Sequence, residues 1–272
     1  MTNTQLRIVS ALVLLGLVLA CLWFGFFFTV LFIGTAGVLI IDEIVTNFFK
    51  RKRFKTRYFL AQALFVVPFL FFNLVEKSPG YDSIFINAAI VVNILLMVFL
   101  FRRQLKPAGF TFYSSKYSPL TGLFILLPMM ALTSLLSSTL WRELMAVLLL
   151  INFGMDTGAW FFGRKFGKHK LWPAVSPNKT IEGLIGGIFV SSIAGSLCWW
   201  AFISRPDLKH FAVFAVLGLL SQIGDLIQSK IKRFFEIKDS SSLIPGHGGV
   251  YDRLDSLLFL TPFFALALAH LN

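Results

Sequence analysis

Two polar segments in the second half of the chain contain residues that could bind phosphate and a divalent cation. The first, residues 229–255, reads SKIKRFFEIKDSSSLIPGHGGVYDRLD and mixes cations, carboxylates, one histidine and a glycine-rich turn. The second, residues 154–183, contains Asp156, then a basic stretch, then SPNKTIEG. Proteins typically hold Mg²⁺ with one or two carboxylates together with substrate phosphate oxygens. Both segments lie between long apolar runs, so the composition predicts phosphate chemistry at a membrane surface.

The helix expected at 210–228 acquires a polar face toward its end. Polar residues recur there at intervals of three and four, which places them on one side of a helix. These positions are Ser221, Gln222, Asp225, Gln228, Ser229, Lys232 and Glu236. A polar stripe on a membrane helix must face the protein interior or a wet cavity, which favours a functional role for Asp225. The alternative is that Asp225 is structural and pairs with Lys232 or another cation.

Asp252 and Asp255 are three residues apart and share a face if the last helix begins there. A carboxylate near a helix N-terminus is also a favourable cap, which is the alternative role for Asp255. Asp225 and Asp252 are therefore the predicted pair of Mg²⁺ ligands.

The turn GHGG at 246–249 predicts close approach of the backbone to a ligand. Gly248 and Gly249 permit that approach and offer amide donors. The turn is not a P-loop, because the lysine and the serine or threonine of that motif are missing. His247 is expected to donate to a carbonyl or a phosphate and is not assigned to the metal.

The segment from Ser176 to Glu182 is expected to contain a helix start, with Thr180, Glu182 and nearby amides available. Helix N-termini bind anions through free N–H groups and the helix dipole, so Lys179 is expected to complete a phosphate pocket. Asp156 lies late in the preceding span, near the same membrane face. The basic stretch 164–170 has the simpler interpretation of an ordinary basic loop.

The composition predicts a membrane protein. Of the 272 residues, 57% are apolar and 14% are charged, whereas soluble domains carry about 25% charged residues. The net charge of +12 comes from short clusters between apolar runs, which is typical of membrane topology and not of a nucleic-acid-binding surface. We therefore expect an all-α polytopic protein with about nine transmembrane helices. The expected spans are 7–22, 25–46, 58–75, 84–101, 118–137, 142–162, 184–203, 210–228 and 255–271.

The distribution of Lys and Arg predicts the orientation. Residues 8–41 are almost unbroken and too long for one crossing, so they are divided into a tight hairpin near residues 23–25. With the N-terminus cytoplasmic and the C-terminus outside, only four of the 25 cations fall in outer segments. Those four are Lys77, Arg142, Arg205 and Lys209. The expected regions are an N-terminal hairpin (1–57), middle helices (58–140) and a C-terminal catalytic region (141–272) with cytoplasmic loops 163–183 and 229–255.

These segments resemble the phosphatidate cytidylyltransferases, the CDP-diacylglycerol synthase family. The resemblance covers residues 154–256, and Asn178 departs from the lysine of the family pattern. Its upstream part is DTGAWFFGRKFGKHKL with SPNKTIEG. Its downstream part comprises Ser229, Lys232, Arg233, Lys238, Asp239, Pro245, His247, Gly248, Gly249, Asp252, Arg253 and Asp255.

The resemblance implies transfer of CMP from CTP to phosphatidic acid, giving CDP-diacylglycerol and pyrophosphate. It also implies dependence on Mg²⁺, with a second cation left open, and a homodimer in the cytoplasmic membrane of a bacterium, with the active site facing the cytoplasm. The candidate catalytic residues are Asp225, Asp252, Lys179 and Lys232. The candidate substrate-binding residues are Asp156, Ser176, Lys230, Arg233, Lys238, Asp239, His247, Gly248, Gly249, Arg253 and Asp255.

Two other functions compete with this interpretation. A CTP-dependent lipid kinase acting on a polyprenol or phytol would need a similar metal and nucleotide site. The match over 229–255 favours the cytidylyltransferase. A transporter with charged residues in its pathway is the other alternative. The concentration of charge on one side of the membrane argues against it.

Overall fold

The computed structural model describes residues 3–76, 79–101 and 116–271. Among these residues, nine helices are long and apolar enough to cross a membrane, which confirms the predicted multi-pass helical fold. They are α1 (Asn3–Phe24), α2 (Phe26–Glu43), α3 (Thr56–Leu70), α4 (Pro79–Phe101), α6 (Thr121–Ser134), α7 (Trp141–Phe166), α8 (Ile181–Phe202), α9 (Leu208–Phe234) and α10 (Tyr251–Leu271). Lys77, one of the cations expected outside, lies beyond the described residues.

Short segments of other geometry extend or connect these helices. A π-helical turn, η1 (Ile44–Phe48), continues α2, and a second, η2 (Phe71–Val75), continues α3. Two 3₁₀ turns, η3 (Ser118–Leu120) and η4 (Leu135–Ser137), lie on either side of α6. Two short strands, β1 (Lys170–Trp172) and β2 (Ser176–Thr180), form an antiparallel hairpin between α7 and α8.

A single glycine divides the long apolar run near the N-terminus. Gly25 has a φ of 101° and separates α1 from α2. Side chains with a Cβ rarely adopt that backbone region, so glycine suits this break. The amide of Gly25 still donates to the carbonyl of Cys21 at 3.2 Å, which satisfies the end of α1. The predicted hairpin is confirmed.

The described residues form two compact units, each built from several parts of the chain. The first unit contains α1, α2, α3, most of α6, the end of α9 from Lys232 and the segment that follows it to Leu254. The second contains α7, the β1–β2 hairpin, α8, α9 to Ile231, α4 from Ile86 and α10 from Asp255. The predicted division of the chain into an N-terminal hairpin, middle helices and a C-terminal catalytic region stays a prediction.

In the first unit, α2 packs closely on α3 through glycine. A Cβ atom on Gly37 would lie 2.2 Å from Cζ of Phe65, and one on Gly34 would lie 2.8 Å from Cε1 of Phe69. The two phenylalanine rings stack with their centroids 5.1 Å apart. Small residues let membrane helices approach closely, which is the main route to packing where lipid surrounds the bundle.

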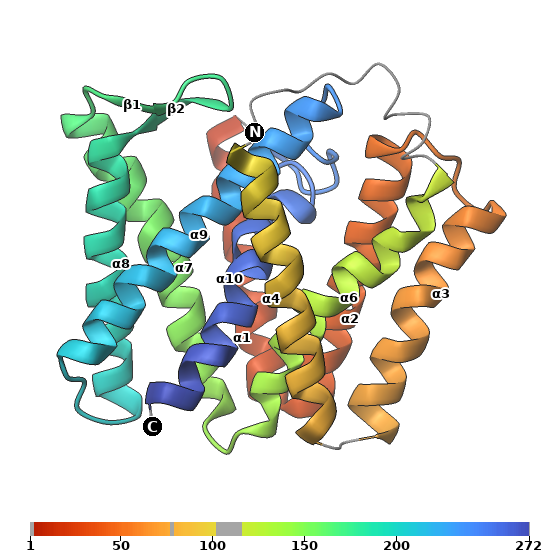
Figure 1. Ribbon diagram of the computed structural model, residues 1–272, viewed down its shortest axis with the longest axis horizontal. Coiled ribbons are helices and arrows are strands. Elements are labelled where there is room, and N and C mark those ends of the chain that lie inside the picture. Colours follow the sequence, from red (N-terminus) through yellow and green to blue (C-terminus); the bar gives the residue numbers. More distant parts are fainter. Residues whose placement is uncertain (1–2, 77–78, 102–115, 272) are drawn as a thin grey trace. The chain divides into compact units, whose positions relative to one another are not determined.

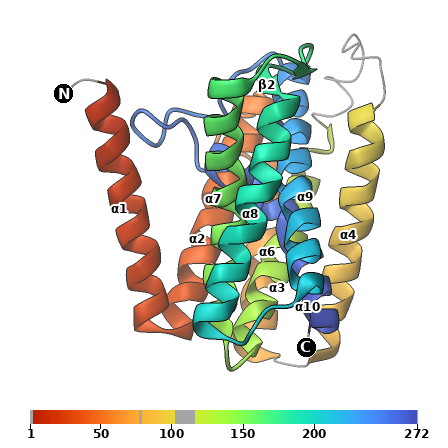
Figure 2. The same ribbon diagram turned by 90° about the vertical axis from the view of Figure 1, so that its left-hand side faces the viewer.

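In the second unit, α7 and α8 lie side by side, with the β1–β2 hairpin at one end of the pair (Figures 1 and 2). A Cβ on Gly158 would lie 2.9 Å from Cα of Gly187, so the two backbones are nearly in contact. Helix α9 packs on α8 in the same way, since a Cβ on Gly218 would meet Oγ of Ser191. This packing fixes the hairpin, which leads directly into α8, relative to α9.

The helix start predicted within residues 176–182 lies at the end of that range, and the residues before it form a strand. Residues Ser176–Thr180 form β2, and α8 begins at Ile181. Cross-strand pairing competes with helix formation here, since Trp172 pairs with Ser176 and Lys170 with Thr180. Thr180 is the N-cap, and its Oγ1 accepts a hydrogen bond from the amide of Gly183 at 3.1 Å.

Candidate active site

Strand β2 delivers Lys179 to Asp225. The Nζ atom of Lys179 forms an ion pair with Oδ2 of Asp225, which lies in the middle of α9. Both side chains are partly exposed. The Oγ atom of Ser229, one turn further along α9, makes a long contact of 3.5 Å with Oδ1 of Asp225. The carboxylate is therefore neutralised by a cation from another element, and among the residues that the structure describes its Oδ1 atom has only this weak contact.

The polar face of α9 is buried in the second unit, as the spacing predicted. Ser221, Gln222 and Gln228 are buried. The Oγ atom of Ser221 donates to Oδ1 of Asn152 on α7 at 2.8 Å. The face ends before Glu236, because α9 stops at Phe234 and Glu236 is exposed. The inclusion of Glu236 in the stripe was therefore wrong.

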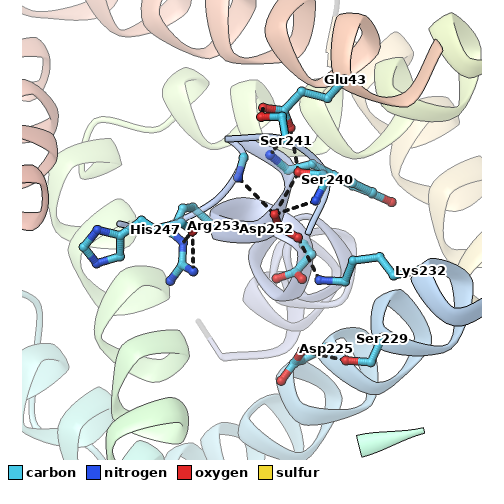
Figure 3. A network of polar contacts seen from close by, with 12 residues as sticks. Glu43, Asp225, Ser229, Lys232, Ser240, Ser241, His247, Asp252 and Arg253 are labelled. Atoms are coloured by element: carbon cyan, nitrogen blue, oxygen red, sulfur yellow. Dashed lines mark hydrogen bonds and ion pairs between the residues drawn. The ribbon is translucent and has the colours of Figure 1, made fainter. Parts of the chain in front are cut away.

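Asp252 lies in the first turn of α10 and is held from several sides (Figure 3). Its Oδ1 atom pairs with Nζ of Lys232 at 2.8 Å. Its Oδ2 atom accepts from the amide of Ser240 at 2.7 Å and from the amide of Gly249 at 3.0 Å. The hydroxyl of Ser240 lies 2.9 Å from the same oxygen. This carboxylate therefore holds the backbone at Ser240 and Gly249 in place, and it also pairs with a cation.

The turn at 246–249 is fixed by its neighbours in the first unit. Arg253 donates from two nitrogen atoms to the carbonyl of His247, at 3.0 and 2.7 Å. The Nδ1 atom of His247 lies 2.7 Å from Oγ of Ser10 on α1, and Nε of Arg7 donates to the carbonyl of Gly246. Burial, followed by the charges of Arg253 and Arg7, lowers the pKa of His247 below its usual value. The φ of 85° at Gly248 suits glycine.

Lys230 has a different environment from the other predicted cations. Its side chain is buried in the second unit, and the residue is 3% exposed. The Nζ atom donates to the carbonyls of Phe99 and Leu100, each at 2.8 Å, in the last turn of α4. A cation that binds the last carbonyls of a helix stabilises it. This geometry describes a structural cap, whereas contact with substrate stays a prediction.

The remaining predicted residues differ in exposure. Asp255 is buried, and its Oδ1 atom accepts from the amide of Ser256 at 2.8 Å. Ser176 is half-buried on β2. Asp156, Arg233, Lys238 and Asp239 are exposed. Their roles toward substrate stay predictions.

Comparison with known proteins identifies the family. A model of the cytidylyltransferase family matches residues 5–271. This chain belongs to the cytidylyltransferase family. It is 46% identical over 120 residues to the phosphatidate cytidylyltransferase of Staphylococcus aureus (strain COL), covering 44% of this chain and 46% of that protein. For the enzyme of the same name from Bacillus subtilis (strain 168), the identity is 41% over 120 residues, covering 44% and 45%. The chain thus matches about half the length of these relatives, and the predicted resemblance is confirmed.

The carboxylates of this cytidylyltransferase-family chain differ in how readily they could accept a cation. Within residues 3–76, 79–101 and 116–271, no group of three or more His, Cys, Asp or Glu side chains could hold a metal ion. Asp225 fits a Mg²⁺ ligand, because within the same described residues its Oδ1 atom has only the 3.5 Å contact with Ser229. Both oxygens of Asp252 have closer partners, so a cation there must replace Lys232 at Oδ1.

Sequence reasoning missed Glu43 and Ser240. Glu43, at the end of α2, accepts hydrogen bonds from the segment that precedes Asp252, and Ser240 contacts both carboxylates. One signal was present in the sequence, since Glu43 is a carboxylate within a long, largely apolar span. An ionisable residue inside a membrane span is a candidate functional residue by default.

Proposed function

We propose that the chain is a phosphatidate cytidylyltransferase, which transfers CMP from CTP to phosphatidic acid and releases pyrophosphate. The observation that carries the proposal is the pairing of both predicted metal carboxylates with predicted phosphate-binding lysines. Lys179 pairs with Asp225, and Lys232 pairs with Asp252. Lysine and carboxylate side chains are the groups that a metal–nucleotide substrate needs. The family match and the names of the relatives support the same activity.

The reaction needs positioning more than a strong base. The phosphate of phosphatidic acid is already an anion, and one of its oxygens attacks the α-phosphorus of CTP. A P–O bond forms there as the bond to the bridging oxygen of the β-phosphate breaks, and the electron pair leaves with pyrophosphate. Phosphoryl-type transfers of this kind are accelerated mainly by alignment and by charge neutralisation.

The charged residues divide these tasks. Asp225 and Asp252 are the proposed ligands of Mg²⁺, which supplies charge neutralisation on the triphosphate when it is bound. Lys179 and Lys232 exchange their carboxylate partners for phosphate oxygens of the substrates. Exposed Arg233 and Lys238 attract the anionic nucleotide. Each lysine–aspartate pair thereby keeps its charges balanced before and after substrate binds.

The proposed location is the cytoplasmic membrane of a bacterium, with the N-terminus and the active site on the cytoplasmic side. The excess of Lys and Arg in alternate segments supports this orientation. CTP is a cytoplasmic metabolite, so the polar segments must face that side for the proposed reaction. A homodimer completes the proposal, on the family resemblance alone.

A double-label assay tests the reaction. Purified protein is incubated with phosphatidic acid and CTP, labelled either in the cytidine or in the γ-phosphate, with and without Mg²⁺. Cytidine label in the lipid fraction, only with Mg²⁺ present, is the expected result. Label from the γ-phosphate in the lipid would instead identify a lipid kinase and overturn the proposal.

A further inference from the structure

Glu43 is a buried carboxylate at the end of a membrane-spanning helix, and it does not belong to the predicted motifs. The residue is 2% exposed and lies at the last position of α2. Removing an ionisable side chain from water is costly unless it is fully hydrogen-bonded. The hydrogen-bond partners of Glu43 therefore show which part of the structure this carboxylate stabilises.

Four donors converge on this carboxylate (Figure 3). The hydroxyl of Ser241 lies 2.7 Å from Oε1, and the amide of Val250 donates to the same oxygen at 2.8 Å. The hydroxyl of Ser240 lies 2.8 Å from Oε2, and the amide of Tyr251 donates there at 2.9 Å. Ser240 and Ser241 lie in the segment between α9 and α10, Val250 is the last residue before α10, and Tyr251 is its first residue, so one side chain connects this segment to the start of α10.

The two amides belong to the start of α10. The first N–H groups of a helix have no partner within the helix, and the positive end of its dipole favours a negative charge. Such groups are commonly satisfied by a side chain just before the helix. Here Glu43 performs this task from a helix about two hundred residues away in sequence, as the separation of 208 between Glu43 and Tyr251 shows.

Asp252 directly follows these two amides and shares a second connection with Glu43. Ser240 places its hydroxyl between the two carboxylates, 2.8 Å from Glu43 and 2.9 Å from Asp252. The hydroxyl has one hydrogen, so it donates to one carboxylate at a time. The amide of Ser240 donates to Asp252 throughout, at 2.7 Å. Glu43 thus holds the residues that in turn hold Asp252.

The backbone around the Glu43 carboxylate leaves space for its contacts with the segment before α10. A Cβ on Gly249 would lie 2.5 Å from Oε2 and 2.7 Å from Oε1 of Glu43, so only glycine leaves room for the carboxylate. Asn47, in the π-helical turn η1, donates from Nδ2 to the carbonyl of Ser240 at 2.6 Å. π-Helical turns inside helices are frequent at functional sites. The end of α2 is therefore built around the segment before Asp252.

We propose that Glu43 is a positioning residue for the cytidylyl transfer, acting through Ser240 and the first turn of α10 to fix the orientation of Asp252. The inference rests on the proposed function only in assigning Asp252 to the Mg²⁺–nucleotide substrate. A small displacement of such a group is enough to lower turnover by about 10²-fold. Loss of the Glu43 carboxylate therefore lowers kcat and raises the Mg²⁺ concentration needed for half-maximal turnover.

Glu43→Gln and Asp42→Asn form a matched pair of variants in detergent-purified protein. Glutamine fills the same space but offers one acceptor oxygen, so at least one of the amides of Val250 and Tyr251 loses its partner.

Asp42 is adjacent in sequence but pairs with Arg53 and Tyr58 and not with the segment before α10. Backbone hydrogen exchange of residues 249–252 and Mg²⁺-dependent turnover of CTP are measured for both variants and for the wild-type protein.

We expect Glu43→Gln to exchange faster at residues 249–252 and to lose most of its turnover. We expect Asp42→Asn to stay close to the wild-type protein in both measurements. Ser241→Ala is the milder variant, because it removes one donor and leaves the buried carboxylate in place. This variant keeps the proposal testable if Glu43→Gln does not fold. We expect it to show a smaller increase in exchange and a smaller loss of turnover. The proposal is overturned if Ser241→Ala and folded Glu43→Gln both show the same exchange rates and the same turnover as Asp42→Asn. If the wild-type protein does not turn over CTP, the proposed function fails, while the exchange rates still decide whether Glu43 holds this segment.

Discussion

The Nζ atom of Lys232 lies 2.8 Å from Oδ1 of Asp252, and the Asp252 side chain is only 5% exposed. Replacing the lysine leaves a nearly buried carboxylate without its cation, which costs more than losing an exposed ion pair. Lys232→Met should lower the free energy of unfolding by about 1–3 kcal/mol. The double variant Lys232→Met/Asp252→Asn should recover part of that loss.

Thermal unfolding of the purified variants in detergent provides the measurement. Lys238→Met removes an exposed lysine from the same segment and should leave the midpoint unchanged. Strictly additive effects of the two substitutions would show that the pair is not coupled.

The Lys179–Asp225 pair leads to a prediction about activity. Asp225→Asn removes the charge proposed to hold Mg²⁺ but keeps the size of the side chain, so the protein should fold. Turnover of CTP should fall by about 10²–10³-fold, the size of effect seen when one preorganised charge-stabilising group is removed from an active site. Asp207→Asn is the control, because Asp207 is an exposed aspartate in the same unit that pairs with His210. Near-normal activity of Asp225→Asn would contradict the metal assignment.

The sequence predicted those features that depend on spacing within one element. Hydropathy located the spans, and intervals of three and four identified the buried face of α9. A single sequence holds no distances between elements. The partner of Asp225 is 46 residues away in sequence, and Ser240 is 197 residues from Glu43. Such contacts follow from tertiary packing, which local patterns do not record.

The position of the helix start at the end of residues 176–182 has a more local cause. Ser-Pro before an apolar run is a good helix start, but the same residues can pair with the strand at Lys170–Trp172. The backbone bond from Ile181 to the carbonyl of His169 and the two hydrogen bonds from His169 to Glu182 tie the hairpin to α8. The combined pairing outweighs one additional helical turn.

The position of Lys230 predicts a loss of stability without a loss of substrate affinity. Lys230→Met leaves the carbonyls of Phe99 and Leu100 without their shared donor, which should lower the free energy of unfolding by about 1–3 kcal/mol. The KM for CTP should stay at the wild-type value. Steady-state kinetics and thermal unfolding of the same preparation separate the two effects. A higher KM with unchanged stability would instead assign Lys230 to substrate binding.

His247 predicts a dependence of stability on pH. Burial and the nearby charges of Arg253 and Arg7 lower its pKa below the usual 6.5. The unfolded chain therefore binds the proton more readily than the folded protein does. Stability should be fully present above the usual pKa and should decrease as the pH falls through 6.5 toward the folded-state pKa.

Unfolding midpoints measured between about pH 5 and pH 8 test this dependence. His247→Gln should flatten the acidic part of the curve. Arg7→Gln should weaken it, because one of the two cations that lower the pKa of His247 is removed. A His247→Gln curve as steep as that of the wild type would assign the acid sensitivity to other groups.

The proposed orientation can be tested with two exposed positions that are expected on opposite sides of the membrane. Arg205 lies between α8 and α9, in a segment expected outside, and Ser242 lies in the segment before α10, expected in the cytoplasm. Cysteine is introduced at either position after Cys21 and Cys198 are changed to alanine. In intact bacterial cells, a maleimide that does not cross the membrane should label Arg205→Cys and should label Ser242→Cys only after the cells are opened. Labelling of Ser242→Cys in intact cells would reverse the orientation, and it would also place the segment around Asp252 on the side of the membrane that lacks CTP.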